Sequence, residues 1–133
     1  MRYTPEHIVS LEPNQILVFG SNQHGQHGKG LAKLAMTFGA VYGVAEGLQG
    51  QTYAIVTKRD WRRPRSSSLP EIGRGIQTML LFAKDYPELE FLVTKIASGL
   101  AGYSISEIRE LFVKLKKWIP NNVVLPREYE VRS

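Results

Sequence analysis

Short runs of apolar residues alternate along the chain with segments in which the apolar residues have helical spacing. The runs cover residues 15–19, 52–57, 91–94 and 122–125, and polar or turn-forming residues bound each of them. Runs that are apolar almost throughout are typical of strands buried on both faces of a parallel sheet. We therefore predict four buried strands.

Apolar residues recur every three or four positions in the segments between these runs, which predicts helices over residues 31–38, 69–85 and 105–119. Gly39 is expected to end the first helix and Pro120 the third. Alternation of strands and helices predicts an α/β fold with a mostly parallel central sheet.

The sequence also predicts where two of the helices begin and suggests one further short strand. The pairs Ser68/Glu71 and Ser104/Glu107 have the spacing of capping boxes, which satisfy backbone N–H groups at helix N-termini. Residues 40–51 are rich in glycine and small residues, and we expect a further short strand around residues 41–44.

Composition excludes several classes of protein. The chain has 133 residues, which is the size of one domain, with a core expected at about residues 15–126. It contains no cysteine, so disulfides and cysteine-bound metals are impossible. No apolar run is long enough to cross a membrane, and the polar N-terminus does not have the pattern of a signal peptide. We expect a cytoplasmic protein without a membrane partner.

The positive charge is concentrated in one segment, residues 58–65, which we call the basic loop. It carries +4 of the net charge of +5, because Asp60 offsets one of its five cations. The arginines of this loop could neutralise phosphates, and its one aromatic residue could stack on a base. Nucleic acid is therefore one possible partner. Solvated arginines on a surface loop are the simpler interpretation. The residues that would contact nucleic acid are Arg59, Trp61, Arg62, Arg63 and Arg65.

Two glycine-rich loops follow predicted strands, at residues 20–30 and 97–103. Glycines let backbone N–H groups approach a phosphate closely, and ligands of parallel sheets bind beyond the carboxyl ends of the strands. Two such loops suggest a diphosphate ligand, although the glycines could equally serve tight turns. Neither loop has the spacing of a Walker motif or of a dinucleotide fingerprint.

Four side chains near these loops have candidate roles. Asn22 could hydrogen-bond a sugar hydroxyl or form an Asx turn. His24 and His27 form a His-x-x-His pair, but zinc usually needs three or four ligands, so we predict no metal site. Lys58 directly follows the second run, at the predicted strand end, where partial desolvation and neighbouring cations would favour the neutral, nucleophilic amine.

Four stretches together resemble the macrodomain family, most closely the subclass of terminal ADP-ribose glycohydrolases and DNA ADP-ribose glycohydrolase antitoxins. They read FGSN at 19–22, HGKGLA at 27–32, YAIVTKR at 53–59 and KIASGLAGY at 95–103. The resemblance implies a three-layer α/β/α sandwich that binds ADP-ribose or an ADP-ribosylated substrate, with no cofactor. It also implies removal of ADP-ribose through an adduct with Lys58.

The resemblance also implies a set of contacts. The first loop would hold the distal ribose and pyrophosphate, the second would cradle the diphosphate, and an aromatic residue would pack against the ribose. The residues at those positions are Asn22, Gly28, Gly30 and Leu31 in the first loop, Ser98, Gly99, Leu100, Ala101 and Gly102 in the second, and Tyr103.

Three departures from the family pattern bear on turnover and on adenine recognition. Ala101 stands where some members carry a catalytic aspartate, and Ala97 where the second loop usually begins with glycine. The aspartate that reads adenine is absent before the first strand, or its role has moved to Glu6 or Glu12. A non-catalytic module that binds nucleic acid or phosphate through the basic loop is the alternative function.

Overall fold

The computed structural model describes residues 2–28, 30–99 and 101–131. It contains a five-stranded sheet in the order β2-β3-β1-β4-β5. Strands β1, β3, β4 and β5 are parallel, and β2 pairs antiparallel with β3 at one edge. The strands are β1 (Gln15–Asn22), β2 (Gly47–Gln49), β3 (Thr52–Lys58), β4 (Glu90–Val93) and β5 (Val123–Val124).

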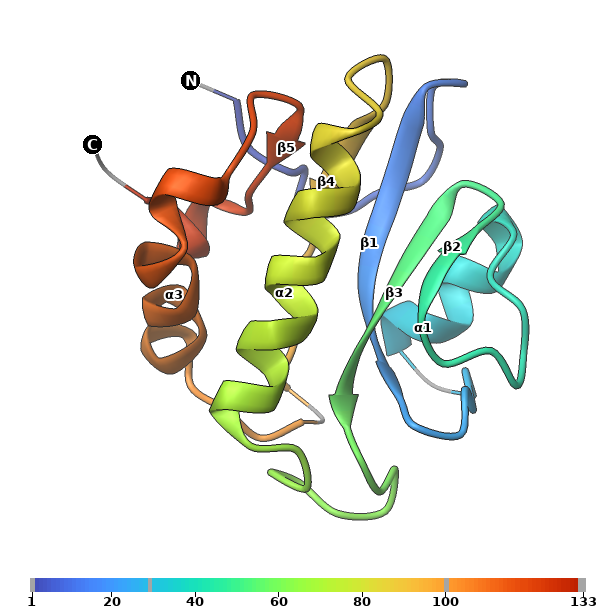
Figure 1. Ribbon diagram of the computed structural model, residues 1–133. Coiled ribbons are helices and arrows are strands. Elements are labelled where there is room, and N and C mark those ends of the chain that lie inside the picture. The colour runs from blue at the N-terminus through green and yellow to red at the C-terminus, as the bar shows by residue number, and fades with distance from the viewer. Residues whose placement is uncertain (1, 29, 100, 132–133) are drawn as a thin grey trace.

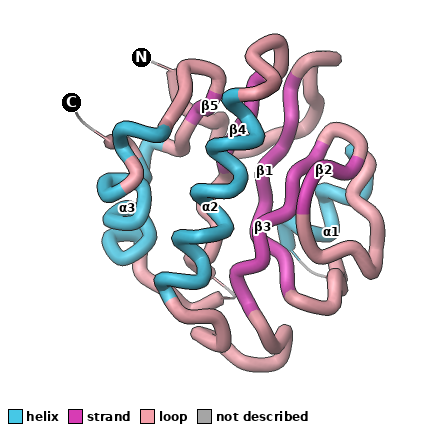
Figure 2. Tube along the Cα trace, viewed as in Figure 1, coloured by secondary structure: helices cyan, strands magenta, loops and turns pink. Residues whose placement is uncertain are grey.

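Helices cover both faces of this sheet, so the chain forms the predicted three-layer α/β/α fold (Figure 1). Helices α2 (Leu69–Lys84) and α3 (Ile105–Lys114) lie on one face, and α1 (Gly30–Ala35) lies on the other. The tube in Figure 2 shows the same arrangement, with long loops at the ends of the strands.

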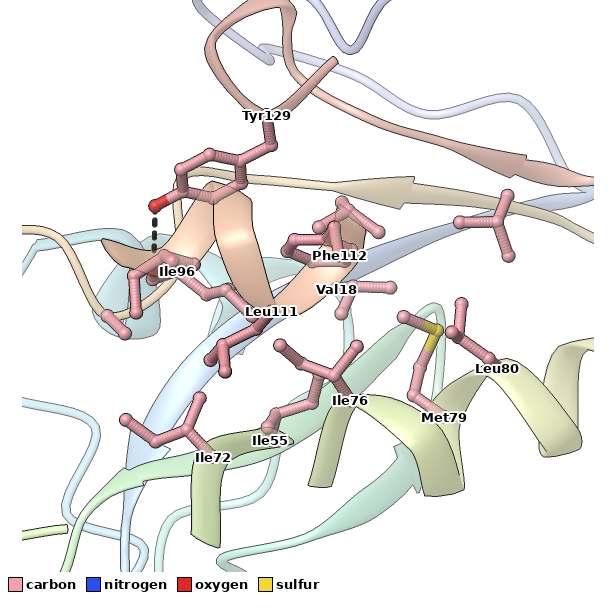
Figure 3. Packing of buried hydrophobic residues seen from close by; sticks show 14 of the residues in the cluster. Val18, Ile55, Ile72, Ile76, Met79, Leu80, Ile96, Leu111, Phe112 and Tyr129 are labelled. Atoms are coloured by element: carbon pink, nitrogen blue, oxygen red, sulfur yellow. Dashed lines mark hydrogen bonds between the residues drawn. The ribbon is translucent and has the colours of Figure 1, made fainter. Parts of the chain in front are cut away.

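Alternate residues of the buried strands supply the two cores. In β1, Ile16 and Val18 face α2 and α3, whereas Leu17 and Phe19 face α1. The larger core, drawn in Figure 3, includes the apolar stripe of α2. Side chains are buried on both faces of the central strands, which explains why their sequences are apolar almost throughout. The stripe of α2 consists of Ile72, Ile76, Met79, Leu80 and Ala83.

The predicted helix starts are confirmed. The side chains of Ser68 and Ser104 each accept a hydrogen bond from the backbone N–H three residues on, and the serine backbone N–H groups donate to the side chains of Glu71 and Glu107. Gly75 of α2 has a packing role: a Cβ there would lie 2.9 Å from Cγ2 of Ile55 in β3. The glycine therefore lets the helix approach the sheet closely.

The structure differs from the sequence prediction at one edge strand and in the last turns of two helices. The strand expected around residues 41–44 is absent, and the edge strand is β2 instead, in a tight hairpin with β3 through Gly50 at φ +57°. The third helix ends at Lys114 and continues as a 3-10 turn, Lys116–Trp118. Ile119 is extended because it precedes Pro120, which disfavours helical backbone one residue earlier. The first helix similarly finishes in a 3-10 turn, Met36–Phe38, before Gly39 at φ +113°.

Candidate functional site

The loops after β1, β3 and β4 gather at one end of the sheet (Figure 1). A cavity of about 450 Å³ opens between them, which is the size of pockets that hold small-molecule ligands. Its lining includes eight residues that the sequence singled out: Asn22, Gly28, Gly30, Leu31, Lys58, Trp61, Ser98 and Ala101.

The remaining predicted residues do not line this cavity. Gly99 and Gly102 belong to the second loop but lie outside the lining, and so does Tyr103. The four arginines of the basic loop point elsewhere, as described below. Leu100 lies outside the described residues.

Asn22 organises the first loop. Its side-chain oxygen accepts hydrogen bonds from the backbone N–H groups of His24 (3.1 Å) and Gln26 (3.0 Å), and its amide donates to the carbonyl of Gln26 (3.0 Å). This is the Asx turn that the sequence left open as an alternative. One amide hydrogen of Asn22 is still unused within this set of bonds, and the residue borders the cavity.

Glycines of the first loop serve two different purposes. A Cβ on Gly25 would lie 2.5 Å from backbone atoms of residues 43 and 44, so this glycine is required for packing. Gly28 and Gly30 have no described atom within 4 Å of a built Cβ, and both line the cavity. Gly28 also has no left-handed φ, so its lack of a side chain is explained neither by packing nor by backbone geometry.

His27 lies in the core of this end and not in the cavity wall. It is fully buried, its Nε2 lies 3.1 Å from the carbonyl of Val44, and its ring packs edge-on against Phe19 and Tyr42. Its Nδ1 has no hydrogen-bond partner among the described residues. His24 is exposed. Across the described chain, no three His, Asp or Glu side chains come together in a group that could hold a metal ion.

The second loop begins with Ala97 in the left-handed region, at φ +64°. Glycine adopts this conformation freely, whereas alanine is strained in it, which accounts for glycine as the usual residue of the family pattern at this position. The backbone N–H groups of Ser98 and Ala101 donate to no other described residue, and both residues border the cavity. They are available to an anionic ligand.

The residues at the end of this loop hold it in place. A Cβ on Gly102 would lie 2.8 Å from Cβ of Pro64, so the glycine allows close contact with the basic loop. Tyr103 is buried, and its hydroxyl donates to the carbonyl of Ser67 at 2.5 Å. The ring therefore supports the loop from the core side, where the resemblance had implied contact with a ribose.

Arg65 joins the basic loop to the second glycine loop. Its backbone N–H donates to Ala101 (2.7 Å), its Nε to the carbonyl of Gly102 (3.1 Å), and its guanidinium lies 4.7 Å from the centre of the Tyr103 ring. It also pairs with Glu107 at 3.0 Å. Arg65 adopts φ +54°, a conformation that these contacts offset. The two loops thus form one wall.

Carboxylates from two helices and from the loop itself neutralise much of the basic loop. Arg59 pairs with Glu71 of α2, and Arg62 and Arg63 share Asp60 at 3.2 and 3.7 Å. The hydrogen bond from Arg59, with two from Ser68, lowers the pKa of Glu71 to about 2, so this carboxylate stays ionised. Counting Arg65 with Glu107, five cations and three carboxylates leave a net charge of +2.

Lys58 differs from these arginines. It is half-buried at the end of β3, lines the cavity, and donates from Nζ to the backbone carbonyl of Trp61 at 2.7 Å. Within the described chain, no carboxylate lies within 4.0 Å of its Nζ. Lys58 therefore lines the cavity without a counterion from those residues.

The sequence missed several lining residues, including Tyr42, Thr57, Thr94, Lys95 and Ile96. The two threonines end buried strands, a position that could have marked them. Lys95 pairs with Glu6 (3.2 Å) and Glu128 (3.5 Å). Glu6, one of the two candidates for the adenine-reading role, therefore pairs with a residue of the cavity wall but does not line the cavity itself. The other candidate, Glu12, precedes β1 and bonds to its first residue, at the opposite end of that strand.

Ile96 connects the cavity wall to the core. The hydroxyl of Tyr129, a fully buried residue, donates to the carbonyl of Ile96 at 2.7 Å (Figure 3). Burial raises the pKa of Tyr129 to about 12. The tyrosine ring stacks on Phe112 of α3, with 5.5 Å between ring centres, so helix α3 and this wall are coupled.

Comparison with known proteins bears on the fold of this chain and not on its function. No protein-family model matches the chain, and no curated protein does. A solved structure from Bacteroides thetaiotaomicron, titled as a protein of unknown function, is similar with a TM-score of 0.57 and 14% identity. The match covers 84% of this chain and 87% of that one. Within the described part of the chain, no helix has the length and apolar character needed to cross a membrane.

Proposed function

We propose that this chain binds ADP-ribose, free or attached to a macromolecule. The observation that carries the proposal is the convergence of both glycine loops and Lys58 on one cavity of about 450 Å³ at the carboxyl ends of three parallel strands. Ligands of such sheets bind at this edge. A pocket of this size accommodates a ligand the size of a nucleotide.

The diphosphate of the ligand would be held mainly by backbone N–H groups. Ser98 and Ala101 contribute two that are not otherwise used, and the N–H groups of Gly30 and Leu31 belong to the first turn of α1, which has no intrahelical acceptors for them. Lys58 adds a positive charge at the same cavity. These residues lie in three of the four stretches in which the sequence resembles macrodomains.

A glycohydrolase activity would use Lys58. Its neutral amine would attack C1 of the ribose, the bond between C1 and the acceptor would break, and the acceptor would leave with a proton from the amine. The bond between C1 and the ring oxygen would then open, the ring oxygen would take the second proton, and an imine would form between C1 and Lys58. Water would then hydrolyse the resulting imine, releasing ADP-ribose and restoring the amine. Ala101 occupies the position of the aspartate found in some family members and supplies no acid, so we expect slow turnover.

Borohydride reduction tests this chemistry. When the protein is incubated with an ADP-ribosylated substrate and borohydride, a covalent adduct should form at Lys58, and Lys58→Ala should form none. Arg63→Ala removes a nearby exposed cation that does not line the cavity, so this control should retain the adduct. Full hydrolysis by Lys58→Ala would exclude the amine mechanism. Absence of both adduct and hydrolysis in the wild type would identify a binding module.

One observation favours the alternative function, nucleic-acid binding through the basic loop. Arg62 and Arg63 are the most exposed cations of this loop, with side chains 71% and 80% accessible, and they directly follow Trp61, which borders the cavity. A strand bound there would lie beside the ligand cavity. The two functions are compatible if the ADP-ribosyl group is attached to nucleic acid.

A further inference from the structure

A second groove lies on the other side of β3, between the outer edge of that strand and helix α2. Its volume is about 490 Å³, and none of its lining residues lines the first cavity. Strand β3 contributes Tyr53 and the backbone at Val56, and α2 contributes Arg74 and Gly75. A Cβ added to Gly75 would lie only 2.9 Å from Cγ2 of Ile55. The helix therefore has no side chain at this position to fill the groove.

The edge of β3 is open along this groove. Its antiparallel ladder with β2 ends at Ala54, which pairs with Gly47. The carbonyl of Gln51 accepts from Leu17 of β1, and successive residues of a strand point their N–H and C=O groups to opposite sides. Thr52, Ala54 and Val56 therefore face away from β1, whereas the carbonyl of Lys58, beyond a register shift, accepts from Gln23 just after β1. Val56 is the first outward-facing residue beyond β2, and its backbone forms no described bond outside the ladders.

Two side chains in the groove have unused polar groups. Tyr53 is only 6% exposed, yet its hydroxyl forms no hydrogen bond with another described residue. Arg74 is exposed, and no described carboxylate lies within 4.0 Å of its guanidinium. Glu71 is occupied by Arg59, so Glu46, at the groove wall beside Tyr53, is the groove carboxylate without a described ion pair.

We propose that this groove binds an extended peptide, which adds a strand to β3 at Val56 and places a carboxylate against Arg74. A strand that pairs with an edge in a groove between sheet and helix obtains affinity from main-chain hydrogen bonds and specificity from alternate side chains. The hydroxyl of Tyr53 supplies a further polar contact. Glu46 disfavours a second acidic residue at its end of the groove. This inference is independent of ADP-ribose binding.

Selection of displayed random octapeptides on the full chain tests the proposal. We expect the selected peptides to carry one Asp, Glu or C-terminal carboxylate and few prolines. Synthetic copies should bind Arg74→Gln about three- to tenfold more weakly, which is the effect of losing an ordinary hydrogen bond, because Arg74 is exposed to solvent. Lys84→Gln changes an exposed cation of the same helix outside the groove and should leave their affinity unchanged.

Backbone N-methylation of a selected peptide tests the strand itself. Methylation of the one N–H that donates to the Val56 carbonyl should weaken binding at least about tenfold, and methylation of the N–H groups on either side should have little effect, because these point away from β3. Val56→Pro, which removes the outward N–H, should weaken binding comparably. Failure to enrich any peptide would overturn the proposal, and so would equal sensitivity to methylation at every position. Peptides that bind Arg74→Gln as tightly as wild type would also overturn it.

Discussion

Removing the Tyr129 hydroxyl should change both the stability of the chain and its dependence on pH. The hydroxyl donates to the carbonyl of Ile96, and the residue is fully buried. Tyr129→Phe keeps the ring that stacks on Phe112 and deletes only the donor. The carbonyl of Ile96 then loses this partner in a buried position, which typically costs about 1–3 kcal/mol.

The pH dependence follows from the raised pKa. Burial raises the pKa of Tyr129 from 10.0 to about 12, so the folded state holds the phenolic proton more tightly than the unfolded state. The corresponding stabilisation is complete below about pH 10 and is lost as the pH rises through about 12. At about pH 11 the loss for this shift amounts to roughly 1.4 kcal/mol.

Urea unfolding of wild type and Tyr129→Phe at several pH values measures this effect. The difference in the free energy of unfolding should be constant up to about pH 9 and should shrink by roughly 1.4 kcal/mol by about pH 11. The other tyrosines and the lysines are present in both proteins, so their titration cancels in the difference. A difference that does not change with pH would refute a buried, hydrogen-bonded Tyr129.

Two further predictions concern the basic loop and its contact with the second glycine loop. Gly102→Ala places a methyl group 2.8 Å from Pro64 Cβ at a residue with φ +87°, so urea unfolding should show a loss of about 2–3 kcal/mol; unchanged stability would contradict this contact. With a net charge of +2, the basic loop should give duplex DNA binding a log–log salt slope of about −2, which Arg62→Gln with Arg63→Gln brings close to zero. A wild-type slope of about −4 would show that the carboxylates do not neutralise the loop.

The buried elements were predictable because burial leaves a clear pattern in the sequence. Strands β1, β3 and β4 are apolar almost throughout, and the capping boxes of α2 and α3 are local signals. Strand β2 has three residues at an edge, with Leu48 exposed, so it has no apolar run that could mark it. Its position depends on pairing with β3, which is tertiary information.

The site was predictable in its loops and less so in its side chains. Glycines after strands indicated both loops correctly, because loops after parallel strands meet at one edge of the sheet. The sequence overestimated the net positive charge around the basic loop, because Glu71 and Glu107 form ion pairs with its arginines from helices α2 and α3. Tyr103 is an aromatic residue at the end of a glycine loop, as a binding residue would be, yet its hydroxyl donates to the carbonyl of Ser67 on the core side. Such pairings depend on three-dimensional contacts.

The most direct test of ADP-ribose binding is calorimetry with wild type, Gly28→Ala and Gly73→Ala. A Cβ at Gly28 has no described atom within 4 Å and lies at the cavity, whereas a Cβ at Gly73 makes only an ordinary contact at 3.6 Å with Leu111 on α3. Both variants should fold.

We predict that ADP-ribose binds wild type and Gly73→Ala equally, binds Gly28→Ala at least about tenfold more weakly, and binds wild type more tightly than AMP or NAD does. No heat with ADP-ribose at millimolar concentration, or equal binding by Gly28→Ala, would contradict the assignment of this cavity.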